Sequence, residues 1–169
     1  MHLRFKPIGR VFLFLALVAA TLQATPAPSP LLQKPAPPFV RHDLEGHPIR
    51  LRGYRGKVVL LNFWATWCAP CQLELRRFAE WQRKNGSDLQ VIAVSMDDSD
   101  APVRAMTRTL NLNFPIVMGD AKLGSRFGGV LGLPLSFLID RRGVIVARFE
   151  GETDQDALDA QVRQLLALH

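Results

Sequence analysis

Cysteine is scarce in this sequence, whose 169 residues contain only two, Cys68 and Cys71. A disulfide between positions so close in the chain closes a very small loop, so it contributes little to stability. A zinc site needs further ligands, but there is no other cysteine and the histidines are scattered. A haem-attachment motif needs a histidine directly after the second cysteine, where this chain has Gln72. The pair is therefore expected to react itself, with no metal and no other cofactor.

Long basic runs are also absent, although the formal net charge is +6. Arg4, Lys6 and Arg10 account for half of this excess, and the remaining basic residues are spread along the chain without a run of five. Nucleic-acid-binding domains carry clustered lysine and arginine on one face. No nucleic-acid partner is therefore expected.

The apolar run at residues 11–22 is shorter than the roughly 20 residues that usually span a bilayer. It follows a basic start and precedes small residues around Ala24, which is the order of a secretory signal. A cleaved signal peptide over residues 1–24 is favoured, and a membrane tether through residues 11–22 is the alternative. No cysteine follows the run, which excludes a lipid attachment there. Either form predicts a periplasmic location.

A proline-rich segment at residues 25–38 follows. Such composition favours extended polyproline geometry, so this segment is predicted to be a linker. Residues 39–169 then form one domain of ordinary size, expected to be monomeric.

Apolar runs and turn signals divide this domain into alternating strands and helices. The nearly unbroken apolar run at residues 57–64 predicts a central strand covered on both faces. A helix is expected from about Pro70 to Lys84. The other predicted elements are a hairpin over 39–51, strands at 89–96, 115–118, 136–140 and 144–150, and helices at 101–110, near 121–127 and after Thr153. This order predicts an α/β fold with a mixed central sheet and helices on both faces.

The cysteines lie just after the predicted central strand, where the helix begins. A helix N-terminus offers unpaired N–H groups and a partial positive charge, which favour a thiolate. Cys68 is therefore the expected nucleophile, and the more buried Cys71 is expected to resolve the mixed disulfide. Pro70 suits the first helical turn, where its missing N–H is not needed.

Four stretches carry a resemblance to a known family: PAPPF, RGKVVLLNFWATWCAPC, VIAVSMDD and GLPLSFLIDRRGVIVARFEG. From about Ala36 onward the chain resembles the TlpA/ResA-type thioredoxin-like proteins, which are exported bacterial thiol-disulfide oxidoreductases. The resemblance implies a thioredoxin fold with an added N-terminal hairpin and a strand-helix insertion around residues 98–120.

The resemblance also assigns a position to Pro134. In thioredoxin-like folds the proline at this position is cis and faces the cysteine pair, and the order Leu133-Pro134 matches it. Backbone polar groups here are then expected to pair with an extended substrate beside Cys68. An ordinary loop proline at the start of a strand is the alternative.

Glu74 follows Cys71 by three residues, which is about one helical turn. The resemblance implies a glutamate beneath the thiols, where it would raise the thiol pKa and carry a proton. An exposed acid in the first helical turn is the alternative. Asn62 stands where cytosolic thioredoxins have a buried aspartate. Trp67 is expected to shield Cys68 and offer a flat apolar contact to substrates, whereas Trp64 is assigned to the core.

These features predict thiol-disulfide exchange with exported protein thiols and disulfides, mainly as a reductant. By resemblance, the clients are haem-site cysteines of apocytochrome c or copper-centre assembly proteins, and a membrane thiol protein donates the electrons. Two other interpretations are a disulfide oxidant or isomerase and a non-catalytic binding or chaperone module. A peroxide-reducing cysteine is not supported, because Ala65 stands where that motif has a threonine.

Overall fold

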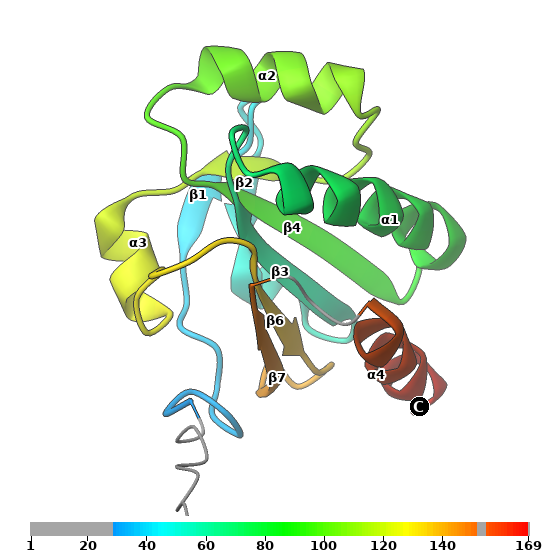
Figure 1. Cartoon of the computed structure of the whole chain (residues 1–169). Helices are drawn as coiled ribbons and strands as arrows, with labels where there is room; N and C mark the ends of the chain where they lie inside the picture. Colours follow the sequence, from blue (N-terminus) through cyan, green and yellow to red (C-terminus); the bar gives the residue numbers. More distant parts are fainter. Residues whose placement is uncertain (1–28, 152–154, 169) are drawn as a thin grey trace, which may run out of the picture.

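The computed structural model of the chain describes residues 29–151 and 155–168 (Figure 1). The predicted signal segment, residues 25–28 of the predicted linker, and Thr153 lie outside the described residues. None of the described helices combines the length and the apolar composition that crossing a membrane requires.

A five-stranded mixed sheet forms the centre of the domain, with the strand order β5-β4-β3-β6-β7. The middle strand, β3 (Val58–Trp64), runs parallel to β4 (Leu89–Ser95) and antiparallel to β6 (Leu135–Ile139). β5 (Ile116–Met118) pairs in parallel with β4, and β7 (Ile145–Glu150) pairs antiparallel with β6. Every residue of β3 is buried because both faces of the sheet are covered, as its apolar run predicted.

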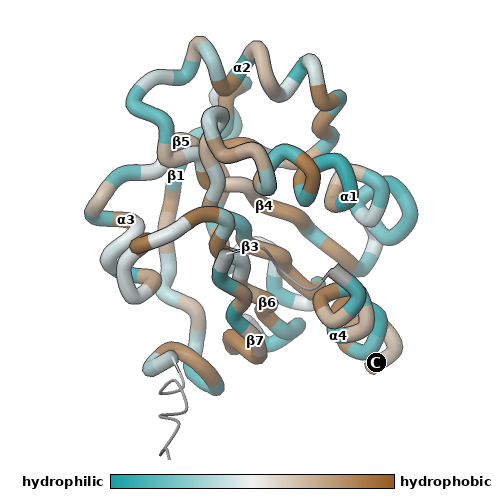
Figure 2. The backbone as a smooth tube through the Cα atoms, in the orientation of Figure 1, coloured by the Kyte–Doolittle hydropathy of each residue, from teal (hydrophilic) through white to brown (hydrophobic). Residues whose placement is uncertain are grey.

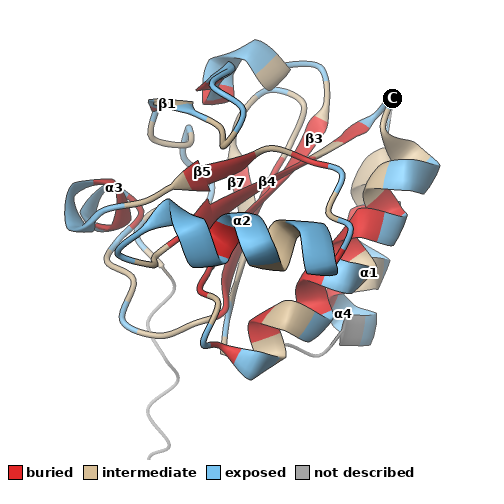
Figure 3. Cartoon of the chain, turned by 90° about the horizontal axis from the view of Figure 1, so that it is seen from above, coloured by how far each residue is buried: buried red, intermediate tan, exposed pale blue. Residues whose placement is uncertain are grey.

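Helices cover both faces of this sheet. α1 (Ala69–Asn85), α2 (Asp100–Thr109) and α4 (Gln155–Ala167) contribute to the core on one face, and α3 (Ala121–Arg126) contributes to the core on the other. Figure 2 shows the hydrophobic strands between more hydrophilic helix surfaces, and Figure 3 shows buried positions along α1 and at one place on α2. α2 and β5 form the insertion expected around residues 98–120. The predicted fold class is therefore confirmed.

The predicted N-terminal hairpin is present as the antiparallel strands β1 (Val40–His42) and β2 (Pro48–Arg50). A short 3-10 helix, η1 (Leu51–Tyr54), follows it. A bridge between Asp43 and Val117 joins the hairpin to β5. The hairpin therefore covers one edge of the central sheet, where unpaired backbone groups would otherwise be exposed.

Part of the proline-rich segment belongs to the domain rather than to a free linker. The Gln33 N–H donates to the Ile145 carbonyl at 2.8 Å, the Ile145 N–H donates to the Lys34 carbonyl at 2.9 Å, and Pro35 bridges Val144. Nearby apolar residues also pack on the core, namely Leu31, Leu32 and Ala36. Non-proline positions in this segment thus pair with Ile145, the first residue of the edge strand β7. The folded unit therefore begins upstream of the predicted boundary at residue 39.

Candidate active site

The two cysteines lie where β3 leads into α1. Cys68 is the N-cap residue of α1 and forms a disulfide with Cys71, and their Cα atoms are 5.3 Å apart. The backbone N–H of Cys71 donates to Cys68 Sγ at 3.3 Å. Such N–H groups and the positive end of the helix stabilise a negatively charged sulfur. The position therefore favours a Cys68 thiolate once the disulfide is reduced.

The two cysteines differ in their exposure. Cys68 retains 6% of its accessible surface, whereas Cys71 retains none. A partner protein can therefore reach Cys68, while Cys71 stays beneath it and within bonding reach. Pro70 lies in the first turn of α1, where the helix does not need its N–H. This geometry supports the expected order of attack, which stays a prediction.

Large apolar side chains are exposed near the disulfide. Trp67 directly precedes Cys68 and is 72% exposed, and Leu73 on the outer side of α1 is 70% exposed. Trp64 is completely buried, as expected for a core residue. Exposed aromatic and aliphatic side chains gain from leaving water when a partner covers them. The region around Cys68 therefore has the character of a protein-binding surface.

The Leu133–Pro134 peptide bond is cis, as predicted. The pairing of Phe63 with Leu135 places the buried Pro134 level with Trp64, at the end of β3 that leads to Cys68. Leu133 packs against the core cluster that contains both cysteines. Within the described residues no hydrogen bond uses the backbone N–H or carbonyl of Leu133. These groups can therefore pair with an incoming chain.

Glu74 is 4% exposed and lies on the buried side of α1 with Cys71. The alternative of an exposed helix acid is therefore wrong. Asn62 lies two residues before Trp64, hence on the same side of β3, and its side-chain N–H donates to Ser136 Oγ at 3.0 Å. Glu74, Asn62 and Ser136 are thus buried polar groups in the layer between α1 and the sheet, where Cys71 also lies.

One polar group of the site was not predicted from the sequence. The Asp97 carboxylate lies just beyond β4. It accepts hydrogen bonds from the Thr66 hydroxyl at 2.6 Å and from the Thr66 N–H at 3.0 Å. It also accepts the Ser95 hydroxyl at 2.7 Å. The side chain of Gln72 in α1 donates to the Thr66 carbonyl at 2.9 Å. The stretch VIAVSMDD contributed to the resemblance, but local spacing gives no signal for a contact across 31 residues.

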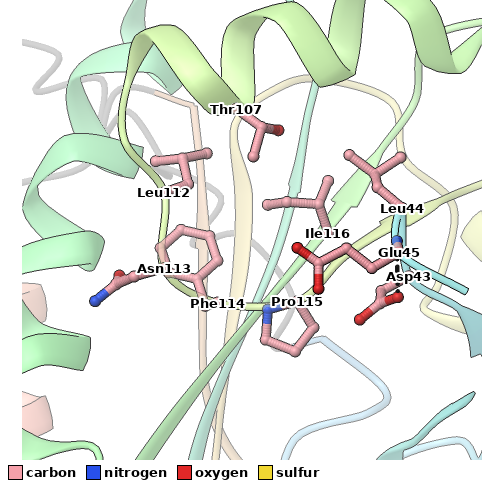
Figure 4. Close-up of a pocket in the computed structure, with 9 residues that line it drawn as sticks. All are labelled: Asp43, Leu44, Glu45, Thr107, Leu112, Asn113, Phe114, Pro115 and Ile116. Atoms are coloured by element: carbon pink, nitrogen blue, oxygen red, sulfur yellow. Dashed lines mark hydrogen bonds between the residues drawn. The ribbon is translucent and has the colours of Figure 1, made fainter. Parts of the chain in front are cut away.

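A separate hollow of about 380 Å³ has neither cysteine in its lining, which consists of residues 43–45 of the hairpin turn, Thr107 and residues 112–116 (Figure 4). Asp43 Oδ1 accepts the backbone N–H groups of Glu45 at 3.0 Å and His47 at 2.8 Å. Burial disfavours the charge on Asp43, but these N–H groups and the His47 ring hold the pKa of Asp43 below its ordinary value. These three side chains could offer metal-ligand atoms. The hydrogen bonds of Asp43 stabilise the hairpin turn, and this explains why Asp43, Glu45 and His47 lie close together.

The chain matches the model of the AhpC/TSA family over residues 32–148. It is 35% identical over 133 residues to the thiol-disulfide oxidoreductase ResA of Bacillus anthracis, covering 78% of this chain and 77% of that protein. The region matched by the family model contains both cysteines and the Leu133–Pro134 pair.

Solved structures show the same relationship. A crystal structure of a putative thiol:disulfide interchange protein DsbE from Chlorobium tepidum aligns with a TM-score of 0.72 and 31% identity, over 79% of this chain and 96% of that one. The exposed lipoprotein thioredoxin Etrx1 of Streptococcus pneumoniae aligns with a TM-score of 0.66 and 29% identity, over 76% of this chain and 100% of that one.

Proposed function

The chain belongs to the AhpC/TSA family of thioredoxin-like proteins and is a thiol-disulfide oxidoreductase, and from this premise we propose that it reduces disulfides of exported proteins. The observation that carries the proposal is the unequal burial of the cysteine pair at the start of α1. A partly exposed N-cap cysteine can attack a client, and the buried cysteine one turn later can complete the reaction.

The reaction begins with the reduced pair. The Cys68 thiolate attacks one sulfur of a client disulfide, the client S–S bond breaks, and the second client sulfur leaves as a thiolate that takes up a proton. Cys71 then loses its proton and attacks Cys68 Sγ. This step forms the Cys68–Cys71 disulfide and releases the other client sulfur as a thiol. Two electrons pass from the enzyme dithiol to the client.

We assign substrate binding to Trp67, Pro70, Leu133 and Pro134. Trp67 presents an exposed indole beside Cys68, and Pro70 lies in the following helical turn. The available backbone groups of Leu133 suit pairing with an extended client segment, as in strand addition to a sheet. An extended segment held there would bring its own disulfide to Cys68.

We assign the proton transfer of the second step to Glu74. Its carboxyl group is buried on the side of α1 that carries Cys71. A nearby carboxylate can accept a thiol proton when Cys71 attacks, and it disfavours a second negative charge on the sulfurs. Asn62 cannot fill this role because its amide has no group that titrates near neutral pH.

The proposed location is the periplasm, reached through a cleaved signal peptide or kept at the membrane by residues 11–22. The order of basic, apolar and small residues in residues 1–24 supports export. The similarity to an exposed lipoprotein thioredoxin supports a location outside the cytoplasm. In this compartment a reductant needs electrons, which we assign to a membrane thiol protein. Haem-site cysteines of apocytochrome c and copper-centre assembly proteins are the proposed clients, and the working form is a monomer.

The order of attack can be tested with insulin as a model protein disulfide. A reduced Cys71→Ala variant should retain insulin chains in a mixed disulfide through Cys68, visible on a non-reducing gel. A Cys68→Ala variant should retain none. Preferential alkylation of Cys71 in the reduced parent protein at neutral pH would contradict the assignment.

A further inference from the structure

We propose that Asp97 is a positioning residue that stabilises the disulfide form of the Cys68–Cys71 pair, an inference that rests on the proposed redox function. Asp97 lies just beyond the end of β4, and its contacts reach the segment immediately before Cys68. It touches neither sulfur in any contact of the described structure, and Thr66 holds its carboxylate beside the turn that precedes Cys68.

Thr66 is held by hydrogen bonds on both sides. On the side of β4, both its N–H and its hydroxyl donate to the Asp97 carboxylate, at 3.0 and 2.6 Å. On the side of α1, its carbonyl accepts the Gln72 side-chain N–H at 2.9 Å. All polar groups of Thr66 are therefore engaged, and the turn that delivers Cys68 is tied to the neighbouring strand as well as to its own helix.

The Asp97 carboxylate is itself oriented by β4. The Ser95 hydroxyl donates to Asp97 Oδ2 at 2.7 Å, and the Asp97 N–H donates back to Ser95 Oγ at 3.1 Å. Ser95 is completely buried at the end of the strand, so this anchor is rigid. Hydrogen bonds to an ionised acceptor are stronger than neutral ones, which explains why a carboxylate rather than an amide suits three donors.

The charge of Asp97 gives this network a redox consequence. Reduction of the disulfide by two electrons and two protons yields two thiols, of which Cys68 is the one poised to ionise. A fixed carboxylate hydrogen-bonded to the turn before Cys68 opposes a negative sulfur but interacts much less with a neutral disulfide. Asp97 therefore favours the disulfide form and makes the reduced enzyme a stronger electron donor.

The test is the equilibrium of the Cys68–Cys71 pair with a glutathione buffer, measured for Asp97→Asn and for the control Asp98→Asn. Asp98 is the adjacent residue, is exposed, and undergoes the same change of charge. Asp97→Asn should shift the equilibrium constant toward the dithiol by about tenfold, or about 30 mV for a two-electron couple. Asp98→Asn should leave it unchanged. Equal equilibrium constants for the two variants would overturn the proposal.

A second pair of variants tests the connection through Thr66 if Asp97→Asn does not fold. Thr66→Val removes the hydroxyl that holds the Asp97 carboxylate at this turn, so it should shift the same equilibrium in the same direction. Thr66→Ser retains the hydroxyl and should keep the parent value. Identical equilibrium constants for Thr66→Val and Thr66→Ser would contradict the role of Thr66. These equilibria do not depend on a client, so they can be measured even if the parent protein does not reduce insulin. A failure to reduce insulin would refute the proposed function but not the role of Asp97.

Discussion

Replacement of Glu74 by glutamine tests the proposed proton carrier, because it keeps the size of the side chain and removes its charge. Glu74 lies six residues after Cys68, which corresponds to about 9 Å along a helix at about 1.5 Å per residue. Two unit charges at about 9 Å interact by about 2 kcal/mol at an effective dielectric constant of about 20. This energy corresponds to a pKa change of about one unit.

Glu74→Gln should therefore lower the pKa of Cys68 by about one unit, because the thiolate no longer faces a second negative charge. Exchange with a protein disulfide should nevertheless become slower, by about a hundredfold at the lower end of general acid-base effects, because Cys71 loses its proton acceptor. For a thiolate that acts only as a nucleophile, a lower thiol pKa would make exchange faster at neutral pH, whereas slower exchange is expected here. Their combination would therefore identify Glu74 as the group that moves the proton.

The assay is a pH titration of the reduced protein by alkylation rate, combined with the rate of insulin reduction. Glu80→Gln is the matched control, because Glu80 lies on α1 but is exposed. Thermal unfolding of each variant verifies that the buried substitution leaves a folded domain. If Glu74→Gln and Glu80→Gln have the same titration and the same turnover, Glu74 has no part in the reaction.

Three further results are expected. A fusion of residues 1–40 to a reporter that works only after export should be active, and an inactive, cytoplasmic fusion would contradict the periplasmic location. Trp67→Ala should raise KM for insulin about tenfold, a typical loss for an aromatic contact at an interface, while thermal stability stays constant; an unchanged KM would remove Trp67 from the binding surface. The Leu123 N–H lowers the pKa of Asp120 against the opposing effect of burial, and Arg41 lowers it further. Since this pKa is lower in the folded state, Asp120 stabilises the fold above about pH 4 and loses this effect as pH falls through its folded pKa. The free energy of unfolding should therefore fall less between pH 5 and 3 in Asp120→Asn than in the parent. Equal decreases of this free energy in the two proteins would contradict the assignment.

The central part of the fold could be predicted because its signals are local. The apolar run of β3 indicates a strand buried on both faces, and the change to helical spacing after Cys68 places the cysteines at a helix start. The cis bond before Pro134 was predicted from the family resemblance rather than from local spacing. Burial of Glu74 was one of two open alternatives, since spacing from Cys71 defines a side of the helix but not what covers it.

Contacts between distant segments could not be predicted in the same way. The hydrogen bonds between Thr66 and Asp97 depend on two neighbouring strands ending at the same level, which periodicity within either segment does not reveal. The attachment of Gln33 and Lys34 to Ile145 was missed because proline-rich composition describes the local backbone preference. The need of an edge strand for hydrogen-bond partners becomes apparent only when the sheet is known.

The reduction potential of the Cys68–Cys71 couple tests the proposed reductant role most directly. The parent protein, equilibrated in glutathione or dithiothreitol buffers of known potential, would be alkylated and its dithiol fraction counted by mass. We predict a value close to the roughly −270 mV of thioredoxin, because a reductant must hold its disulfide form stable. A value near the roughly −120 mV of the oxidant DsbA would contradict the account and support disulfide formation instead.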